Sequence, residues 1–238
     1  MTTPRDFRGK VVAVTGAAGG LGRALVHAFA QVGAQVAALD RDAAALAVLA
    51  QETAGTPLMT AVCDVTRLDD CQAAIAHVCE RLGGVDLLIN NAGIAHRSAF
   101  ADTQVDVLRR VMDVNFFGAV HCTHAALPSL RQRRGMVVAI SSVAGFSPLI
   151  GRTGYAASKH ALHGFFDSLR TEVQDDGVDV LIVCPSFIDT GIDRAALAAD
   201  GLPAAQARKT TGATTQPAEV AAAILQAACR RRHLLLFS

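Results

Sequence analysis

A tyrosine and a lysine with the spacing of one helical turn are the first candidates for chemistry. Tyr155 is the only tyrosine in the chain, and Lys159 follows it by four residues. On a helix such residues share a face, with Cβ atoms about 5–6 Å apart. A nearby ammonium favours the phenolate and lowers the pKa of a tyrosine. Such a tyrosine can exchange a proton with an alcohol or carbonyl oxygen near neutral pH. Because a lone pair of this kind also arises by chance, the assignment depends on the rest of the chain.

A glycine-rich turn near the N-terminus predicts a nucleotide site. The run Thr15-Gly16-Ala17-Ala18-Gly19-Gly20-Leu21-Gly22 follows a predicted strand and opens a predicted helix. Glycines allow the tight turn and let backbone N–H groups approach a pyrophosphate at the positive end of the helix. The spacing differs from the strict G-x-G-x-x-G, and glycine turns are common. The strand–turn–helix context nevertheless favours dinucleotide binding.

The end of the second predicted strand bears on the choice between NAD and NADP. Asp40 lies 18 residues after Gly22. A carboxylate at this point can bind the adenosine ribose 2′-OH and repel a 2′-phosphate. Arg41 favours the opposite choice, because an arginine there can stack on adenine or accept a 2′-phosphate. We expect NAD to be preferred over NADP.

Short apolar runs alternate with helical patterns along the whole chain. The runs are nearly continuous in apolar residues, which is typical of parallel strands covered on both faces. Seven strands separated by helices predict an α/β fold with a right-handed, doubly wound parallel sheet and helices on both faces. The predicted strands are 10–15, 34–39, 57–63, 85–90, 135–141, 178–184 and 233–237, and the helical patterns are 21–32, 42–54, 67–82, 103–132, 154–175 and 217–231.

The chain is predicted to be a single domain over residues 1–238. This length suits one large α/β domain and is short for two, and the sequence contains no linker or internal repeat. The least patterned part is 186–216, which is rich in Ala, Thr and Gly. A long, weakly periodic segment after a late strand predicts a substrate lid.

Composition excludes several classes of function. The net charge is +1, so no general attraction to nucleic acid or to a membrane surface is expected. We find neither a membrane-spanning apolar run nor the apolar core of a signal peptide. The six cysteines form no C-x-x-C pair and fall mostly in apolar patterns, which indicates free buried thiols rather than disulfides or metal ligands. A cytoplasmic protein is expected.

Taken in order, these and further motifs resemble the short-chain dehydrogenase/reductase family, whose members have the Rossmann fold. The resemblance spans nearly the whole chain. Each motif alone is unspecific, whereas the ordered set is highly specific, and the 13-residue interval from Ser142 to Tyr155 also matches. The motifs are the glycine turn at 15–22, Asp64-Val65, Asn90-Asn91-Ala92-Gly93, Asn115, Ser142, Tyr155, Lys159 and the segment from Pro185 to Thr190.

The resemblance implies a catalytic role for four residues. Tyr155 is then the general acid/base, and Lys159 lowers its pKa and binds the nicotinamide ribose. Ser142 donates a hydrogen bond to the substrate oxygen, where negative charge develops. Asn115 holds a water that continues a proton relay to Lys159. Considered alone, Ser142 is as well explained as a strand-end cap and Asn115 as an ordinary helix residue.

The resemblance also implies a set of cofactor contacts. The glycine turn would hold the pyrophosphate, and the carboxamide of the nicotinamide would lie at the end of the sixth strand. Considered alone, the pair of asparagines after the fourth strand is equally a turn. The implied contacts are Gly16, Gly19, Gly20, Leu21 and Gly22 at the pyrophosphate, Asp40 at the ribose, Asp64 and Val65 at the adenine, Asn90 at the adjoining ribose, and Gly93, Tyr155, Lys159, Pro185, Ile188 and Thr190 toward the nicotinamide.

Two departures from the family pattern concern the sixth strand and the C-terminus. Ser186 follows Pro185 where the family commonly has glycine, and it adds a hydroxyl beside the nicotinamide pocket. The run Arg230-Arg231-Arg232 and the apolar residues after it replace a glycine-rich, acidic ending. This ending resembles relatives that continue beyond the last strand. The three arginines are more consistent with the C-terminal end of a helix, where positive charge is favourable, than with a binding site for a polyanion.

Two histidine pairs have a spacing compatible with a metal site. They are His121/His124 and His160/His163, each separated by three residues. Because no carboxylate or cysteine pattern stands beside them, helix-surface or interface histidines are expected and no metal is predicted.

The motifs together predict an NAD(P)-dependent oxidoreductase that interconverts an alcohol and a carbonyl compound. A 3-oxoacyl thioester reductase remains the alternative of the same class, although Asp40 disfavours the NADPH usual there. A cofactor-sensing regulator is less consistent with the retained tyrosine and lysine. A sugar-nucleotide epimerase would share these two residues but normally needs a larger C-terminal substrate domain. A homodimer or homotetramer is expected through the helices at 103–132 and 154–175. The predicted pocket residues, which indicate a largely apolar substrate, are Ala95, His96, Phe146, Leu149, Ile150, Phe187 and Ile192.

Overall fold

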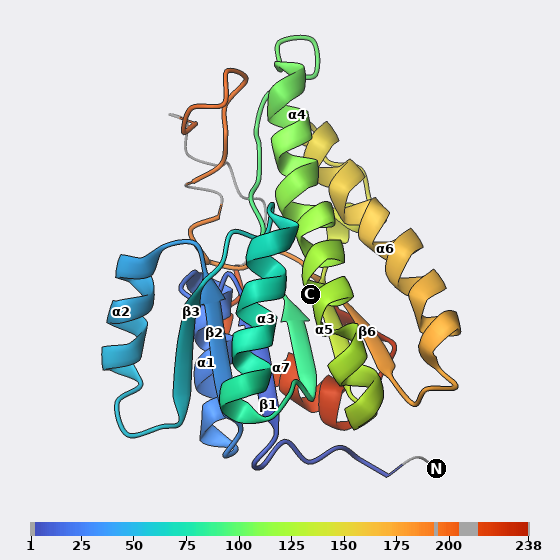
Figure 1. Ribbon diagram of the computed structural model, residues 1–238. Helices are drawn as coiled ribbons and strands as arrows, with labels where there is room; N and C mark the ends of the chain where they lie inside the picture. Colours follow the sequence, from blue (N-terminus) through green and yellow to red (C-terminus); the bar gives the residue numbers. More distant parts are fainter. Residues whose placement is uncertain (1–2, 193–194, 205–213, 238) are drawn as a thin grey trace.

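Seven parallel strands form one sheet in the order β3-β2-β1-β4-β5-β6-β7. The computed structural model describes residues 3–192, 195–204 and 214–237 (Figure 1). Val12 of β1 pairs with Val36 on one side and with Leu87 on the other, so β1 and β4 are neighbours at the centre. The strands are Val11–Thr15 (β1), Gln35–Asp40 (β2), Leu58–Val62 (β3), Leu87–Asn90 (β4), Met136–Ile140 (β5), Asp179–Pro185 (β6) and Leu234–Phe237 (β7).

Helices connect successive strands and cover both faces of the sheet. Along β1, Val11 and Ala13 pack toward α3, α5 and α6, whereas Val12 and Val14 pack toward α1, α2 and α7. This alternation explains why the strands are apolar without interruption. The helices are Gly20–Gln31 (α1), Ala43–Glu52 (α2), Leu68–Leu82 (α3), Val105–Met112 (α4), Gly118–Arg133 (α5), Thr153–Val173 (α6) and Pro217–Cys229 (α7), with a 3₁₀ turn at Val143–Gly145.

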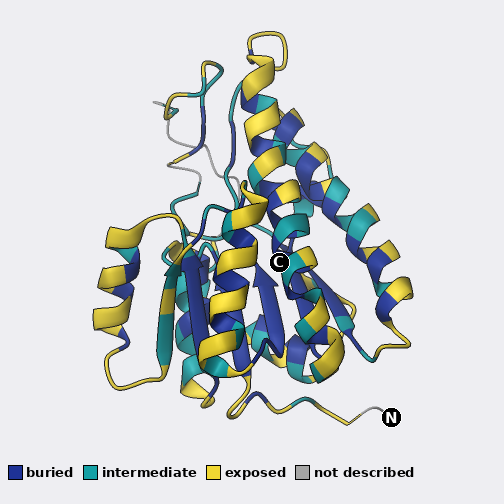
Figure 2. Cartoon of the chain, viewed as in Figure 1, coloured by how far each residue is buried: buried dark blue, intermediate teal, exposed yellow. Residues whose placement is uncertain are grey.

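The predicted doubly wound sheet is therefore confirmed, and each strand begins and ends within two residues of its expected bounds. Coverage on both faces is incomplete at the two edges of the sheet. Val62 on β3 and Leu236 on β7 are each 60% exposed, while the inner strands are buried (Figure 2). An edge strand has a neighbour on one side only, so it is less enclosed than a central strand.

The predicted helix at 103–132 is interrupted. Residues Asp113–Phe117 form a π-helical turn between α4 and α5. Asn115 lies at the centre of this turn and is buried, with its side chain bonded to the backbone of Ile94. A π-turn accommodates one more residue per turn than an α-helix and is frequent at functional sites. The amphipathic spacing of the sequence does not distinguish it from a continuous helix.

The connections after β1 and β4 leave in opposite directions, which opens a crevice at the carboxyl ends of these two strands. Of the predicted lid, 186–216, residues 193–194 and 205–213 lie outside the described residues. Described residues of this segment, such as Ser186, Thr190 and Ala195, line the cavity in the crevice. Its described parts form isolated bridges between Ile188 and Thr215 and between Leu197 and His96. In the described part of the chain, every helix is too short or too polar to cross a membrane.

Candidate active site

One cavity of about 430 Å³ lies in this crevice. It extends from the glycine turn after β1 to the start of α6, so it brings together residues that are far apart in the sequence. Of the predicted site residues, all but two line it: Gly16, Gly19, Gly20, Leu21, Gly22, Asp40, Asp64, Val65, Gly93, Ser142, Tyr155, Lys159, Pro185, Ile188 and Thr190.

The glycine turn needs glycine at three points. A Cβ on Gly22 would overlap the carbonyl oxygen of Gly16 and lie 2.9 Å from the Cα of Ala17. Gly16 has a φ of +61°, and a Cβ there would lie 2.8 Å from the Cα of Ala92. A Cβ on Gly20 would lie 2.7 Å from the Cα of Thr190, so the segment after β6 can approach the turn only because Gly20 has no side chain. Helix α1 then begins without a side-chain cap and without an acidic residue in its first turn. Its N–H groups suit a pyrophosphate, so the turn fits the phosphates of a dinucleotide.

Asn91 holds this turn in place from the neighbouring strand. Its Nδ2 donates to the carbonyl oxygens of Thr15 (2.9 Å) and Gly16 (3.0 Å). The hydroxyl of Thr15 in return accepts the N–H groups of Asn91 and Ala92, both at 3.0 Å. These bonds cross-link the ends of β1 and β4. The sequence indicates a turn at Asn91 but not this clamp, because the partner lies 75 residues away.

Asp40 lies where a ribose-binding carboxylate is expected. Its Oδ2 accepts the N–H of Ala18 in the glycine turn (3.0 Å), and its Oδ1 accepts the N–H of Asp42 (3.1 Å). Asp40 and Arg41 both line the cavity. The two backbone bonds fix the carboxylate at the edge of the nucleotide crevice, whereas Arg41 is exposed.

The loop after β3 forms the next part of the wall. Asp64 accepts hydrogen bonds from the backbone N–H (3.0 Å) and the hydroxyl (2.8 Å) of Thr66. Burial raises the pKa of Asp64, but these hydrogen bonds, with help from Arg41 and Arg67, lower it below its usual value overall. His121 on α5 donates to the carbonyl oxygen of Val65 at 3.0 Å. The loop is thus held from both ends.

Tyr155 and Lys159 both reach the cavity from the first turns of α6. Lys159 is 4% exposed, and its Nζ donates to the carbonyl oxygen of Ile140 at the end of β5 (2.8 Å). The same Nζ lies 5.6 Å from the centre of the Tyr155 ring. Burial lowers the pKa of Lys159 to about 8, so the ammonium is still the main form at pH 7.

Ser142 and Arg152 line the cavity together with this pair. The Oγ of Ser142 accepts the N–H of Ala144 (3.2 Å), so its own O–H can be donated toward a ligand. The guanidinium carbon of Arg152 lies 5.9 Å from the centre of the Tyr155 ring, and Arg152 also lines the cavity. Arg152 is not among the site residues predicted from the sequence, because it stands in an irregular stretch where no pattern shows the direction of a side chain.

Asn90 and Asn115 do not line the cavity. Asn90 is buried, and its Nδ2 donates to the hydroxyl of Thr123 on α5 (2.9 Å); its Oδ1 has no partner among the described residues. The Oδ1 of Asn115 accepts the N–H of Ile94 (2.8 Å), and its Nδ2 donates to Ile94 (3.0 Å) and to Ser158 (2.9 Å). Asn115 thus connects the loop after β4 to Ser158 of α6, the residue before Lys159.

The predicted substrate pocket is only partly correct. Ala95, Leu149, Phe187 and Ile192 line the cavity. Phe146 and Ile150 do not, and both are exposed at the surface. His96 is fully buried behind the wall instead, where its Nε2 accepts the N–H of Gly154 at 2.9 Å. Coil residues carry no periodicity, so the sequence could not show which of them point inward.

Three of the four histidines of the singled-out pairs, His121, His160 and His163, bond to protein oxygens. His160 bonds to the carbonyl oxygen of Ala156 in its own helix (2.9 Å), and His163 bonds to the hydroxyl of Ser141 (3.0 Å). Together with His121 they lie outside the one group of candidate metal ligands found in the described ranges.

A family model, that of the short chain dehydrogenases, matches residues 10–200. The chain belongs to the short-chain dehydrogenase family. As a short-chain dehydrogenase it is an oxidoreductase of a family that uses a nicotinamide cofactor. The dehydrogenase/reductase SDR family member 7B of Bos taurus is 40% identical over 234 residues, which are 94% of this chain and 72% of the relative. An SDR family protein 7-like of Anopheles gambiae is 37% identical and covers 95% of this chain and 74% of its own.

Two solved short-chain dehydrogenases have the same architecture. One from Streptomyces avermitilis superimposes with a TM-score of 0.84 at 32% identity and covers 96% of this chain and 88% of its own. One from Burkholderia phymatum, solved in complex with NAD, has a TM-score of 0.87 at 26% identity, with 98% and 90% covered.

Proposed function

We propose that this short-chain dehydrogenase transfers a hydride between a nicotinamide cofactor, NAD in preference to NADP, and the alcohol or carbonyl group of a small, largely apolar substrate. The observation that carries the proposal is that Ser142, Tyr155 and Lys159 line the same cavity as the glycine turn. The turn accounts for dinucleotide binding, and the three side chains account for proton transfer beside it.

A bound nicotinamide supplies or accepts the hydride. Tyr155 gives its phenolic proton to the carbonyl oxygen in reduction and takes it back from the alcohol in oxidation. Ser142 donates a hydrogen bond to the same oxygen and stabilises negative charge there. The ammonium of Lys159, 5.6 Å from the ring centre, favours the phenolate of Tyr155.

Asn115 supports this proton path indirectly. It does not touch the cavity, but its Nδ2 bonds to Ser158, the residue before Lys159, and its Oδ1 holds the backbone of Ile94. A Cβ on Gly93 would lie 3.3 Å from the Asn115 Oδ1 and 3.7 Å from the Lys159 Nζ. The Asn115 Oδ1 and the Lys159 Nζ thus both lie close to Gly93, which is consistent with the relay water expected from the family resemblance.

The experiment is a panel of ketones with NADH and NADPH and of alcohols with NAD⁺ and NADP⁺, followed by nicotinamide absorbance. Acetoacetyl thioesters are included, because selective turnover of these would favour the thioester reductase. The matched control is Tyr155→Phe, which keeps the ring. Turnover of an apolar alcohol or ketone that depends on the Tyr155 hydroxyl supports the proposal. Cofactor binding without turnover of any panel member would instead favour a regulator.

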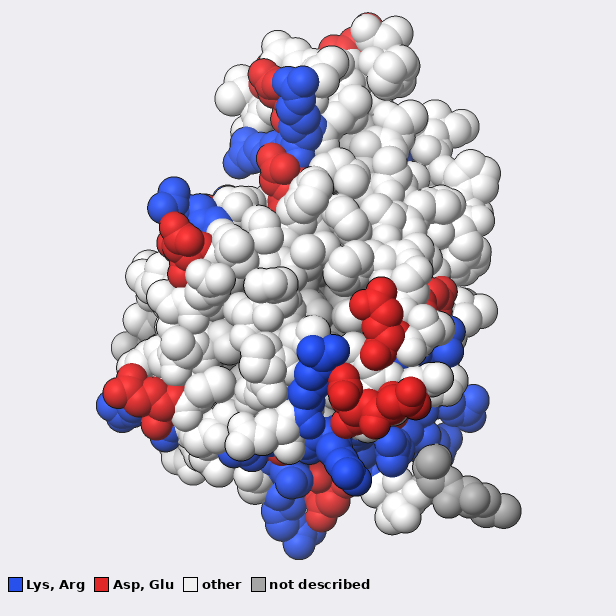
Figure 3. All heavy atoms as spheres, turned by 45° about the vertical axis from the view of Figure 1, so that its right-hand side comes forward, with Lys and Arg blue, Asp and Glu red and all other residues white. Residues whose placement is uncertain are grey.

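The oligomeric state is part of the same proposal. We propose a homodimer or homotetramer formed through α4, α5 and α6, the helices within 103–132 and 154–175. Phe117, at the end of the π-turn beside α5, is 44% exposed. Figure 3 shows a broad central area without Lys, Arg, Asp or Glu. The charged residues of this face lie mainly at the top, along the left edge and in the lower part. Light scattering at several concentrations tests this, and a monomer at every concentration would contradict it.

A further inference from the structure

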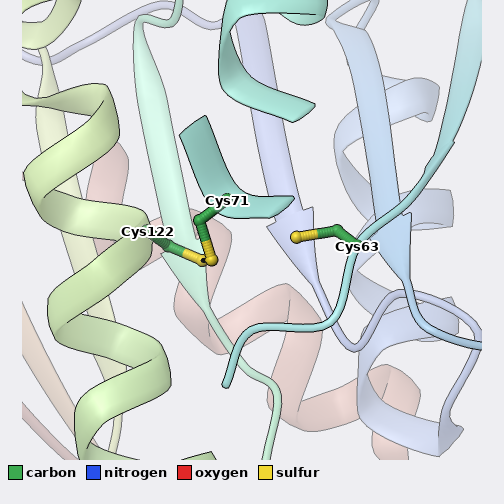
Figure 4. Close-up of side chains that lie close together, drawn as sticks. All are labelled: Cys63, Cys71 and Cys122. Atoms are coloured by element: carbon green, nitrogen blue, oxygen red, sulfur yellow. Dashed lines mark hydrogen bonds between the residues drawn. The ribbon is translucent and has the colours of Figure 1, made fainter. Parts of the chain in front are cut away.

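Three cysteines meet behind the adenine end of the cavity. Cys63 follows β3, Cys71 lies in the first turn of α3, and Cys122 lies on α5. Their sulfur atoms all lie within 4.8 Å of one another, and the three side chains point toward a common centre (Figure 4). All three residues are buried. Neither the proposed reaction nor the site residues above use this cluster.

The spacing of the cysteines in the sequence contains no metal motif and therefore predicts free thiols. Cys71 follows Cys63 by eight residues, and Cys122 follows Cys71 by 51. They meet because α3 and α5 pack side by side on the sheet next to the end of β3. The cluster is therefore a product of the tertiary fold.

The distances between the sulfurs suit a single metal ion. With metal–sulfur bonds of about 2.3 Å, two sulfur ligands of one ion lie about 3.8 Å apart in tetrahedral and about 4.0 Å apart in trigonal geometry. The Sγ atoms of Cys71 and Cys122 are 3.5 Å apart, and the largest separation in the group is no more than 4.8 Å. Shifts of a few tenths of an ångström bring all three sulfurs into coordination distance.

We propose that Cys63, Cys71 and Cys122 form a binding site for one thiophilic metal ion, and that Cu⁺ binds there in preference to Zn²⁺. Soft thiolate ligands select Cu⁺ and Zn²⁺ over harder ions. Zn²⁺ in structural sites almost always takes four protein ligands. In the described part of the chain, no histidine or carboxylate joins the three sulfurs. A site of three sulfurs in an apolar core therefore favours Cu⁺, the ion that accepts a low coordination number. The protons that the thiols lose on binding go to solvent.

The cluster adjoins the cofactor cavity. Cys63 lines that cavity. The Sγ of Cys71 lies 3.6 Å from the carbonyl oxygen of Val65 and 4.0 Å from that of Asp64, so the cluster sits directly beneath the loop that forms the adenine wall. An ion enters past Cys63 and is then held between this loop, α3 and α5. The site exists independently of the reaction proposed above.

The test is competition for Cu⁺ between the reduced full-length chain and a chromophoric Cu⁺ chelator under anaerobic conditions. We expect the wild type to remove one Cu⁺ per chain. Cys71→Ala and Cys122→Ala should each weaken binding by at least tenfold, because each removes one of three ligands. Cys79→Ala is the matched control, since Cys79 lies on the same helix α3 but outside the cluster. No uptake by the wild type, or uptake unchanged in both cluster variants, overturns the proposal.

Two further measurements keep the test decisive. If a cluster variant fails to fold by circular dichroism, Cys63→Ala, at the cavity wall, takes its place with the same expectation. Zn²⁺ is titrated in parallel against a fluorescent Zn²⁺ chelator. Weaker binding of Zn²⁺ than of Cu⁺, lost in the same variants, supports the three-sulfur site. Tighter binding of Zn²⁺ would overturn the preference for Cu⁺.

Discussion

The Nε2 of His96 accepts a hydrogen bond of 2.9 Å from the backbone N–H of Gly154, the residue that precedes Tyr155. The first N–H groups of a helix have no partner inside the helix. His96 supplies one from a separate loop, and the backbone of Leu197 pairs with that loop on its other side. His96 therefore fixes the start of α6, where the proposed acid/base stands, without touching the cavity itself.

We expect His96→Ala to cost about 1–3 kcal/mol of stability, because it leaves a buried N–H without its acceptor. It should also lower kcat by displacing Tyr155. His96→Gln offers an amide oxygen as a replacement acceptor and should recover much of both losses. Thermal unfolding and steady-state kinetics measure this. Equal kcat for the alanine and wild-type enzymes would contradict the positioning role.

The same bond predicts a pH dependence. Burial, with a smaller contribution from Arg152, lowers the pKa of His96 below its usual value. The unfolded chain then binds a proton at about pH 6.5, whereas the folded chain binds it only at lower pH. The contribution of His96 to the free energy of unfolding is therefore fully present above about pH 6.5 and is lost as the pH falls below this value. We expect the melting temperature of the wild type to decline more steeply than that of His96→Gln between pH 7 and 5.

Removing only the phenolic hydroxyl, in Tyr155→Phe, should lower turnover by about 10²–10⁴-fold, the usual effect of losing a positioned acid/base. Cofactor affinity should stay nearly unchanged, because the ring and Lys159 remain. Ser142→Ala should cost less, since it deletes one hydrogen bond to the reacting oxygen and leaves the proton path. A Tyr155→Phe enzyme with near wild-type turnover would refute the assignment.

Lys159→Met should abolish most activity and yet stabilise the chain without cofactor. Burial lowers the pKa of Lys159 from 10.5 to about 8, which corresponds to a penalty of about 3 kcal/mol for keeping the ammonium charged at neutral pH. Loss of the bond to Ile140 offsets part of the gain. Because the folded pKa is the lower one, wild-type stability should rise between pH 8 and 10.5 relative to the methionine variant. Thermal melts across this range test the expectation, and a methionine variant that is less stable at pH 7 contradicts it.

Binding of NADH should be tighter than binding of NADPH, because the carboxylate of Asp40 would face the 2′-phosphate. Asp40→Asn removes the charge while keeping a hydrogen-bonding side chain, and we expect it to improve NADPH binding by about tenfold, or about 1.4 kcal/mol. Fluorescence titration measures both cofactors. Arg41→Ala is the companion variant: tighter NADPH than NADH binding that survives it would rule out the preference for NAD.

Periodicity and turn residues were enough to predict every strand and the glycine turn, because parallel strands and phosphate-binding turns have strong local signals. They were not enough for contacts made across the fold. Asn91 and the three cysteines of the cluster find their partners through strand order and helix packing. His96 and Arg152 stand in irregular segments, where the direction of a side chain depends on the surrounding structure. The strands and the turn that form the pocket were therefore predicted correctly, but the set of side chains that line it was predicted only in part.

The π-turn at Asp113–Phe117 makes this stretch unusually sensitive to chain length. Helix α4 packs against α6, whereas α5 packs against α3, and the wide turn supplies the change of face between them. Deleting one residue here would restore an ordinary helix and rotate Asn115 away from Ile94 by roughly a quarter of a turn. We therefore expect a related chain with a single-residue gap at this point to have lost the support that Asn115 gives to the active site, even when all of its catalytic residues are still present.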